Sequence, residues 1–320
     1  MKKLPFFLPF GGCRGRCVYC SQSTITGTAD IPSPEFVASV LRELDEPREV
    51  CFFGGSFCRI GHSRVKEYLD CVINSAPSGS RIRFSTYPGD LSDPYIMNLV
   101  KAYPIACIEL GIPSLDPAVL SLCKRDADPQ VIIEDIKNIM DEDLPIGVQM
   151  MIGLPGQTRE SSIADLKKLS EIKGPLSWDL RLYPCLVLEA TELDTMRING
   201  SYTPLTLNQA VEWGGVFIDL ATSLGFNPIR VGLQESELLA SQVRGGPHHP
   251  ALGEMISSES LVRKLTKYNQ NGPWMVPEEH ISKFTGHGCF GLRRLADLTG
   301  TTTAAVSEKL FFFPPTGKII

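Results

Sequence analysis

The sequence predicts an α/β fold, a partial (β/α)6-type TIM-like barrel with a mainly helical C-terminal extension. Short β-branched or aromatic runs alternate with longer segments of helical period along most of the chain. Turns rich in glycine or polar residues follow one expected strand after another. With 320 residues, 43% of them hydrophobic, the chain can bury one large core and still form an appendage. We expect the barrel in residues 1–235 and the extension, packed on it, in residues 236–320.

Each expected strand is a short apolar run bounded by turn residues. The strands expected are residues 5–10, 50–53, 82–85, 105–110, 146–152 and 178–183, with a weaker one at 227–231. Strands that are separated by helices pair in parallel, because the chain has to cross back over the sheet before the next strand begins.

The helices expected between these strands each carry one apolar face. The first has Ser33 as its N-cap and Pro34 at its first position, followed by apolar residues at helical spacing. Residues 65–73 and 131–140 repeat that spacing. An open doubly wound sheet remains an alternative to the barrel, since a single sequence does not reveal strand order.

Chemically distinctive residues come directly after successive strands. The turns after the first five strands contain, in order, Cys13, Cys17 and Cys20, then Gly54, Gly55 and Ser56, then Thr86, then residues 111–114, and then residues 153–156. In (β/α) barrels the C-terminal ends of the strands form the reactive edge. We therefore expect all five turns to share one mouth.

The first of these turns is a C-x3-C-x2-C run formed by Cys13, Cys17 and Cys20. Thiolates are the usual ligands of a [4Fe–4S] cluster, and three of them leave one of the four irons open to a small molecule. A structural zinc site would need a fourth Cys or His nearby, and a disulfide framework suits short secreted chains, so both are weaker alternatives. The other seven cysteines form no second ligand group in the sequence.

Composition bears on where the protein acts and on its partners. No apolar run approaches the roughly 18 residues that a membrane span needs, so we expect a cytoplasmic protein without a membrane partner. The formal net charge is −5, which lacks the basic field common among nucleic-acid binders. Nucleic acid is a possible partner but not the favoured one.

Several motifs, taken in their order, resemble the radical SAM superfamily. The cysteine run with Tyr19 before its last Cys resembles the cluster motif, and Cys-Phe-Phe-Gly-Gly-Ser-Phe at 51–57 resembles the second-strand glycine motif. Ile-Arg-Phe-Ser-Thr-Tyr-Pro and Gln-Met-Met-Ile-Gly-Leu-Pro-Gly-Gln-Thr follow in the order of the branch that contains the Elongator catalytic subunit and the oxygen-independent coproporphyrinogen oxidases. The resemblance covers residues 4–202 and thins beyond them.

The resemblance implies two cofactors, a [4Fe–4S] cluster and S-adenosylmethionine (SAM), and an electron donor such as a flavodoxin or ferredoxin. It puts Cys13, Cys17 and Cys20 on three irons, with the amino and carboxylate groups of SAM on the fourth. The residues that it implies as contacts of SAM are Gly54, Gly55, Ser56, Thr86, Arg125, Gln149 and Met151. The glycines would let the backbone approach SAM closely, and the polar side chains would hydrogen-bond it.

Some of these residues also have a purely structural interpretation. Read singly, the two glycines form an ordinary turn, Arg125 is a solvated surface charge and Met151 belongs to the core. Four further residues have open roles. Cys58 and Cys185 could face the mouth, and His248 and His249 either reach it or remain solvated.

The implied activity is reductive cleavage of SAM to a 5′-deoxyadenosyl radical, which abstracts hydrogen from a substrate. The substrate motifs differ from the branch, because Asp126 and Ala127 replace a Gly-His pair and Pro113 replaces a Gln. The substrate, a small molecule or a peptide, therefore stays unidentified, and no catalytic residue is assigned. Two other functions remain open, tRNA-base modification of the Elongator type and non-catalytic heme carriage related to coproporphyrinogen oxidases.

Overall fold

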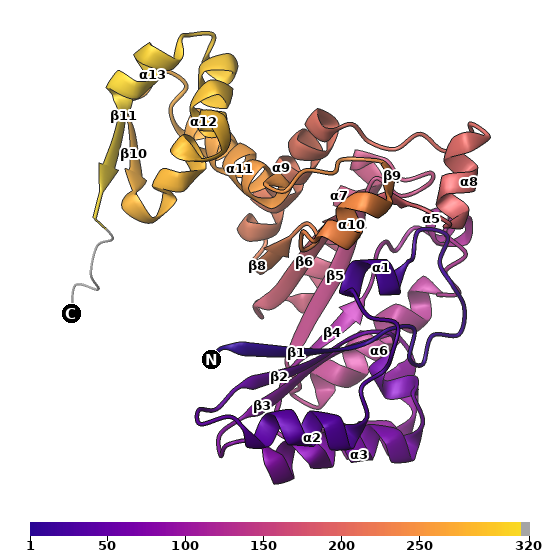
Figure 1. Ribbon diagram of the computed structural model, residues 1–320. Helices are drawn as coiled ribbons and strands as arrows, with labels where there is room; N and C mark the ends of the chain where they lie inside the picture. Colours follow the sequence, from indigo (N-terminus) through magenta and orange to yellow (C-terminus); the bar gives the residue numbers. More distant parts are fainter. Residues whose placement is uncertain (315–320) are drawn as a thin grey trace.

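The computed structural model describes residues 1–314, and its centre is a parallel sheet of seven strands (Figure 1). The sheet strands are β1 (Lys3–Leu8), β2 (Glu49–Gly54), β3 (Arg81–Thr86), β4 (Ile105–Gly111), β5 (Ile146–Ile152), β6 (Trp178–Pro184) and β8 (Phe226–Val231). Their order in the sheet is β1-β2-β3-β4-β5-β6-β8, and all neighbouring pairs are parallel.

This order confirms the predicted class of fold. All seven expected strands form, and each pairs with the next strand of the sheet in chain order. A doubly wound sheet would reverse its strand order at a switch point, so that alternative is wrong. Because β1 and β8 are the two edges of the sheet, the barrel is incomplete and forms a half-barrel.

Helices and two small pairs of strands complete the described chain. The α-helices are α1 (Gln22–Thr26), α2 (Pro34–Arg42), α3 (His62–Ser75), α4 (Pro94–Lys101), α5 (Pro117–Leu122), α6 (Pro129–Asp141), α7 (Arg159–Lys173), α8 (Glu192–Ile198), α9 (Leu207–Ser223), α10 (Glu237–Gln242), α11 (Leu252–Tyr268), α12 (Ile281–Thr299) and α13 (Thr303–Lys309). Strand β7 (Val187–Leu188) pairs with β9 (Val243–Gly245), and β10 (Trp274–Pro277) pairs with β11 (Leu310–Phe313). None of the helices described is both long and apolar enough to cross a membrane.

The main core lies between the sheet and the helices on its convex side. Alternate residues of the strands point into it, including Phe52 and Phe84, which are at most 1% exposed. Helix α2 begins as predicted, because the Ser33 hydroxyl accepts a hydrogen bond from the Phe36 amide at 3.2 Å and Pro34 follows it. The convex layer therefore holds the strand ends in fixed positions.

The concave face of the sheet carries a buried ionic network. Arg83, whose side chain is 6% exposed, pairs with Glu49, with Glu109 at 2.9 Å and with Asp179 at 2.9 Å. Arg181 reaches the same Glu109 carboxylate at 2.6 Å. These residues come from four strands, so the network ties together strands that are not neighbours. Removing one partner of such a buried pair typically costs about 3–5 kcal/mol.

The C-terminal part has a hydrophobic core of its own, contributed by α11, α12, α13, β10 and β11. Residues Gly286–Cys289 interrupt α12 with non-helical backbone. The second half of α12 is joined to α13 through Gly300 in the left-handed conformation, which gives a helix–turn–helix arrangement. In Figure 1 this part (yellow) projects away from the half-barrel. The division at residue 235 stays a prediction, and residues 315–320 of the predicted extension lie outside the described chain.

Candidate functional site

The loop between β1 and α1 carries the three cysteines of the C-x3-C-x2-C run. Cys13 is exposed, Cys17 and Cys20 are half-buried, and all three thiols are free. Backbone hydrogen bonds shape the loop, from the Cys13 amide to the Phe10 carbonyl at 3.1 Å and from the Cys20 amide to the Cys17 carbonyl at 3.0 Å. The loop therefore presents its thiols at the C-terminal end of the first strand, as predicted.

The three thiols lie close enough to affect one another's ionisation. Burial, together with the charges of Cys17 and Cys13, raises the pKa of Cys20 to about 12. Burial and then the charge of Cys17 raise the pKa of Cys13. The cation of Arg125 opposes both shifts. A positively charged group bound among these thiols would relieve their mutual repulsion.

Arg125 is held beside this loop by contacts at both ends of its guanidinium group. Its Nη1 lies 3.6 Å from the Cys17 Sγ atom, and its Nη2 donates to the Gly111 carbonyl at 2.5 Å. The guanidinium stacks on the Tyr87 ring at 4.4 Å from the ring centroid. Its Nε atom is buried without a hydrogen-bond partner among the described residues. Arg125 is therefore a fixed cation at the thiols rather than a solvated surface charge.

The glycine turn after β2 packs directly against the cysteine loop. A Cβ atom on Gly55 would lie 1.9 Å from the Gly11 carbonyl oxygen, and one on Gly12 would lie 2.3 Å from the Ser56 carbonyl oxygen. The Ser56 amide also donates to the Gly11 carbonyl at 2.6 Å. Gly54 has a φ of +114°, a conformation that side chains rarely adopt. The turn therefore packs against the cysteine loop. This packing is separate from the contact with SAM that the resemblance implies for the same glycines.

Ser56 and Thr86 meet at the same strand ends, but both face a carboxylate that the sequence did not single out. The hydroxyl of Ser56 donates to Asp90, and Thr86 Oγ1 donates to Asp90 Oδ2 at 2.7 Å. The Tyr87 amide donates to Ser56 Oγ at 2.8 Å, and Arg59 forms an ion pair with Asp90 at 2.5 Å. Asp90 follows the Pro-Gly turn after β3, and that turn was the only available signal for it.

Gln149 and Met151 lie at different places within the half-barrel. Gln149 Nε2 donates to Glu109 Oε2 at 2.8 Å and so joins the ionic network of the concave face. Met151 packs against the small hydrophobic cluster that contains Val18 of the cysteine loop. Met151 therefore lies near the cysteine loop, whereas the amide nitrogen of Gln149 is hydrogen-bonded to Glu109 in the ionic network.

Gln22, on α1, is a further site residue that the sequence analysis missed. Its Nε2 donates to the Gly54 carbonyl at 2.8 Å and lies 4.0 Å from Cys13 Sγ, and its Oε1 accepts from the Phe10 amide. A single glutamine in a polar stretch gives no sequence signal. It bridges the glycine turn to the cysteine loop, so α1 and β2 are locked together.

The four residues with open roles divide into two pairs. Cys58 is buried, and its amide donates to Thr86. Cys185 is also buried, and burial raises its pKa to about 12, which suits a packed thiol. His248 and His249 line a separate cavity at the end of β8.

Three thiols on one loop are the donors that this site offers to a metal. No three His, Cys, Asp or Glu side chains in residues 1–314 lie close enough together to hold a single metal ion. A structural zinc site needs its ligands around one point, whereas the ligands of a polynuclear cluster bind different irons. Thiolates are the usual ligands of an iron–sulfur cluster, so three free thiols on one loop fit such a group.

A half-barrel with a cysteine loop at its strand ends is typical of one class of proteins, and comparison with known sequences identifies that class. Residues 7–169 match the Radical SAM superfamily, and residues 178–261 match the Radical_SAM C-terminal domain. Since the first match spans half of the chain, the chain belongs to the Radical SAM superfamily.

Individual relatives share less with the chain. It is 28% identical over 149 residues to the tRNA uridine(34) acetyltransferase of Methanocaldococcus infernus, which is 47% of this chain and 27% of that protein. It is 21% identical over 234 residues to the heme chaperone HemW of Lactococcus lactis, 71% of this chain and 60% of that protein. The chain thus spans about a quarter of the first relative.

A solved structure confirms the likeness of fold. The archaeal Elp3 of Methanocaldococcus infernus, solved with an N-terminal deletion, superposes with a TM-score of 0.57 at 20% identity. The superposition covers 83% of this chain and 62% of that one. At this level of identity it shows a shared fold and nothing finer.

Proposed function

We propose that this protein is a radical SAM enzyme in which Cys13, Cys17 and Cys20 hold a [4Fe–4S] cluster and SAM binds beside them. When bound, the reduced cluster and SAM would supply a 5′-deoxyadenosyl radical that abstracts hydrogen from a substrate. The observation that carries the proposal is the position of three free thiols on one loop at the strand ends, with a guanidinium 3.6 Å from one of them.

The chain's own residues would then position the reactants. Gly55 and Gly11 interlock, which fixes the cysteine loop against β2. Arg125 compensates negative charge on the thiolates. Gln22 holds the Gly54 carbonyl, and Met151 offers an apolar contact beside the loop. The proposal keeps Gly54, Gly55, Arg125 and Met151 as contacts of SAM, in addition to these roles.

Ser56, Thr86 and Gln149 belong to the proposal in a modified form. The hydroxyls of Ser56 and Thr86 would shape the site through Asp90. Gln149 would present its Oε1 atom to the interior while its Nε2 stays on Glu109. The proposed substrate is a small molecule or a peptide, reached from the concave face. A cytoplasmic location and an electron donor such as a flavodoxin or ferredoxin belong to the same proposal.

Anaerobic reconstitution tests the cluster. Wild-type protein should take up about four irons and four sulfides per chain, and Ser at Cys13, Cys17 or Cys20 should prevent this, because a hydroxyl is a poor ligand for iron of this kind. The matched controls are Cys107→Ser, at a buried thiol, and Cys289→Ser, at an exposed one. Stoichiometric zinc without sulfide in the wild type would contradict the proposal.

A second candidate, tRNA modification, is favoured by one observation. A relative 28% identical over 149 residues is named as a tRNA uridine(34) acetyltransferase. The net charge of −5 opposes it. If tRNA is the substrate, its affinity should come from local Lys and Arg contacts and fall steeply with salt, which filter binding at 50 and 200 mM salt would measure.

The third candidate is heme carriage, since a relative 21% identical is named as a heme chaperone. A carrier without radical chemistry would bind one heme per chain through His248, His249 or a Cys and leave SAM intact. Absorbance titration with heme, followed by analysis of SAM under reducing conditions, separates this function from the first.

A further inference from the structure

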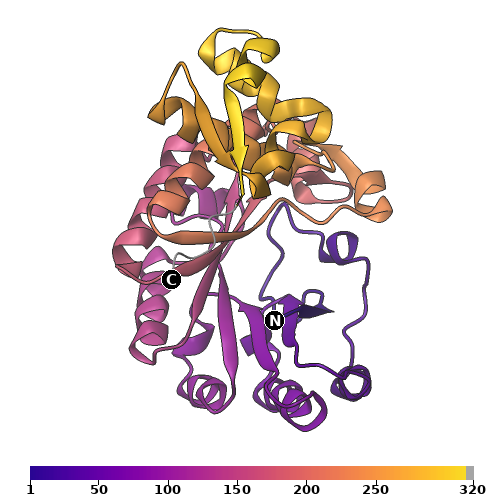
Figure 2. The same ribbon diagram turned by 90° about the vertical axis from the view of Figure 1, so that its left-hand side faces the viewer.

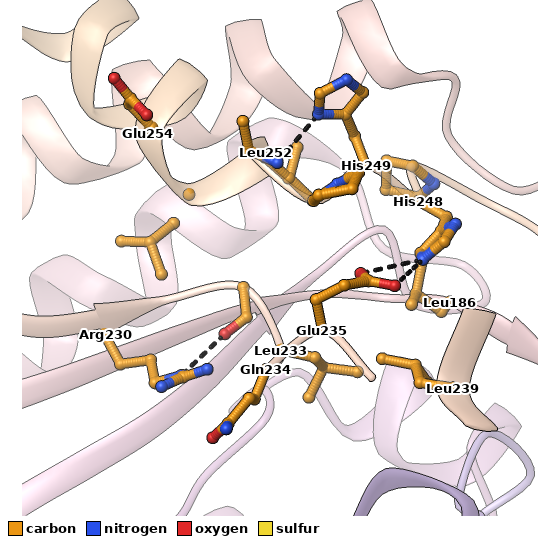
Figure 3. A pocket seen from close by; sticks show the side chains of 16 residues that line it. Leu186, Arg230, Leu233, Gln234, Glu235, Leu239, His248, His249, Leu252 and Glu254 are labelled. Atoms are coloured by element: carbon orange, nitrogen blue, oxygen red, sulfur yellow. Dashed lines mark hydrogen bonds and ion pairs between the residues drawn. The ribbon is translucent and has the colours of Figure 1, made fainter. Parts of the chain in front are cut away.

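A cavity opens where β8 ends, on the far edge of the sheet from the cysteine loop (Figure 3). Its volume is about 450 Å³, within the range of small-molecule sites. The loop that follows β8, the His248–His249 loop and the first turn of α11 form its walls. It lies at the C-terminal ends of the strands, the edge at which (β/α) barrels carry out chemistry.

The cavity is connected to the cysteine side of the molecule by packed residues. Ile25 of α1 shares a small hydrophobic cluster with Leu186, Leu239 and Leu233, and the last three residues also line the cavity. Helix α10 contacts α1, and Figure 2 shows the N-terminal loop (indigo) and the segment after β8 (orange) on the same side of the sheet. A ligand held in the cavity would therefore lie at the rim of the same mouth.

Arg230 is the arginine that lines this cavity, and it lies on the concave face of the sheet. It is in register with Arg181 on the neighbouring strand, so both side chains belong to the same face. Burial raises the pKa of Tyr183, and the nearby charges of Arg181 and Arg230 oppose that rise. Arg230 thus lies between the interior of the half-barrel and the cavity.

Unlike Arg83 and Arg181 on the same face, Arg230 pairs with no carboxylate of residues 1–314. Arg83 and Arg181 are both paired with Glu109 at 2.9 and 2.6 Å. Among the described residues, Arg230 forms no ion pair, and its Nε atom donates only to the Gly232 carbonyl at 3.2 Å (Figure 3). A half-buried guanidinium with free donors is suited to bidentate binding of a carboxylate or phosphate group.

The other charged groups of the cavity leave this cation available. The Glu235 carboxylate lies 3.1 Å from His248 Nε2, as Figure 3 shows, so it has a partner of its own. His249 Nδ1 accepts from the Ala251 amide at 3.0 Å, and burial together with the nearby imidazoles lowers the His249 pKa. A neutral ring of this tautomer carries its proton on Nε2, where it is a hydrogen-bond donor. Glu254 lies on the α11 wall, against Gly286.

We propose that this cavity binds an anionic group of the substrate, a carboxylate or a phosphate, with Arg230 as its anchor. The inference rests on the proposed function, because it gives that enzyme's substrate a chemical class. The inference also assigns binding and reaction to opposite edges of the sheet. The anchor at β8 fixes one end of the substrate, and the reacting end extends toward the cysteine loop at β1.

Binding of simple anions tests the anchor directly. Isothermal titration of the reconstituted protein with inorganic phosphate, and separately with succinate, should show saturable binding and tell which of the two groups the cavity prefers. Arg230→Gln should weaken binding of the preferred probe by at least about tenfold, the loss expected for a hydrogen bond to a charged group. Arg230→Lys should recover part of it, because the charge remains but the planar fork is lost.

The matched control is Arg244→Gln, which removes an exposed arginine of β9 that pairs with Glu189, the residue directly after β7. It should bind the anions like the wild type. An equal loss in both variants, unchanged affinity in Arg230→Gln, or no saturable binding by the wild type would overturn the inference.

Cleavage of SAM in the same samples separates this inference from the proposed function. Arg230→Gln should retain the iron content of the wild type and its rate of SAM cleavage without substrate, because the anchor does not contact the cysteine loop. Wild-type protein that cleaves SAM but binds neither anion refutes the anchor alone. Wild-type protein that binds phosphate through Arg230 but never cleaves SAM refutes the proposed function alone.

Discussion

Substitution of Gly55 by Ala should loosen the cysteine loop, although position 55 is distant from the cysteines in the sequence. The added Cβ atom would lie 1.9 Å from the Gly11 carbonyl oxygen, 2.6 Å from the Gly11 nitrogen and 2.7 Å from its carbonyl carbon. All three atoms are backbone, so no side-chain rotation can relieve the contact. The Gly11 segment would have to retreat by about 1 Å, which breaks the packing between the two loops.

The expected cost of this overpacking is about 1–3 kcal/mol of unfolding free energy. Urea unfolding under anaerobic conditions measures it, and iron and sulfide analysis after reconstitution measures the loop. We expect Gly55→Ala to retain much less iron than the wild type, because Gly11 lies two residues before Cys13. The control is Gly15→Ala, within the cysteine run itself, where an added Cβ meets nothing within 4 Å.

Gly15→Ala should keep both iron content and stability. Full iron content and unchanged unfolding free energy in Gly55→Ala would show that the two loops are not locked together. An equal loss of iron in Gly15→Ala would show that the run tolerates no substitution, and the packing argument would then fail.

Two further predictions concern single charges. Arg125→Gln removes the guanidinium next to Cys17 Sγ, so the cluster's midpoint potential should fall by roughly 50–100 mV in an EPR-monitored redox titration. The control, Lys124→Gln, removes an exposed partner of Glu192 and should leave the potential unchanged. Equal potentials in the wild type and both variants would contradict this prediction. Burial raises the pKa of Asp135 from 3.8 to about 6, so its contribution to stability is present below pH 4 and is lost as pH rises to 6, by at most about 3 kcal/mol. Asp135→Asn should remove that step from the pH dependence of urea unfolding, and Asp141→Asn, at an exposed residue of the same helix, should not; a step of the same size in Asp135→Asn would refute the assignment.

The strands could be predicted from the sequence because burial on a parallel sheet leaves short apolar runs. Phe52 and Phe84 lie in two such runs, and both are buried in the convex layer. The shared mouth followed from the same pattern, since the turn after each parallel strand lies at one edge. The cysteine loop and the glycine turn meet there as expected.

Polar partners across the sheet could not be predicted, because they depend on register and on the curvature of the sheet. Glu109 receives bonds from Arg83, Arg181 and Gln149, residues on three different strands. In the sequence these three residues stand 26, 72 and 40 positions from Glu109, respectively. The family resemblance implied Gln149 as a contact of SAM. In the structure its amide nitrogen is hydrogen-bonded to Glu109 in this network.

Ser56 and Thr86 show a similar limit on a smaller scale. Their place at the strand ends followed from the strand pattern, but the direction of their hydroxyls did not. Both point to Asp90, which reaches back from a 3-10 turn (Asp90–Ser92) after β3. Likewise, the cavity at Arg230 exists because β8 is an edge strand of an incomplete barrel, which no local pattern specifies.

The most direct test of the central claim is the fate of SAM under anaerobic reduction. Wild-type protein with a full complement of iron and sulfide, given SAM and dithionite without substrate, should slowly form 5′-deoxyadenosine and methionine in equal amounts, measured by liquid chromatography and mass spectrometry. Cys17→Ser, treated in the same way, should leave SAM unchanged. Intact SAM after prolonged reduction of the cluster-replete wild type would contradict the account.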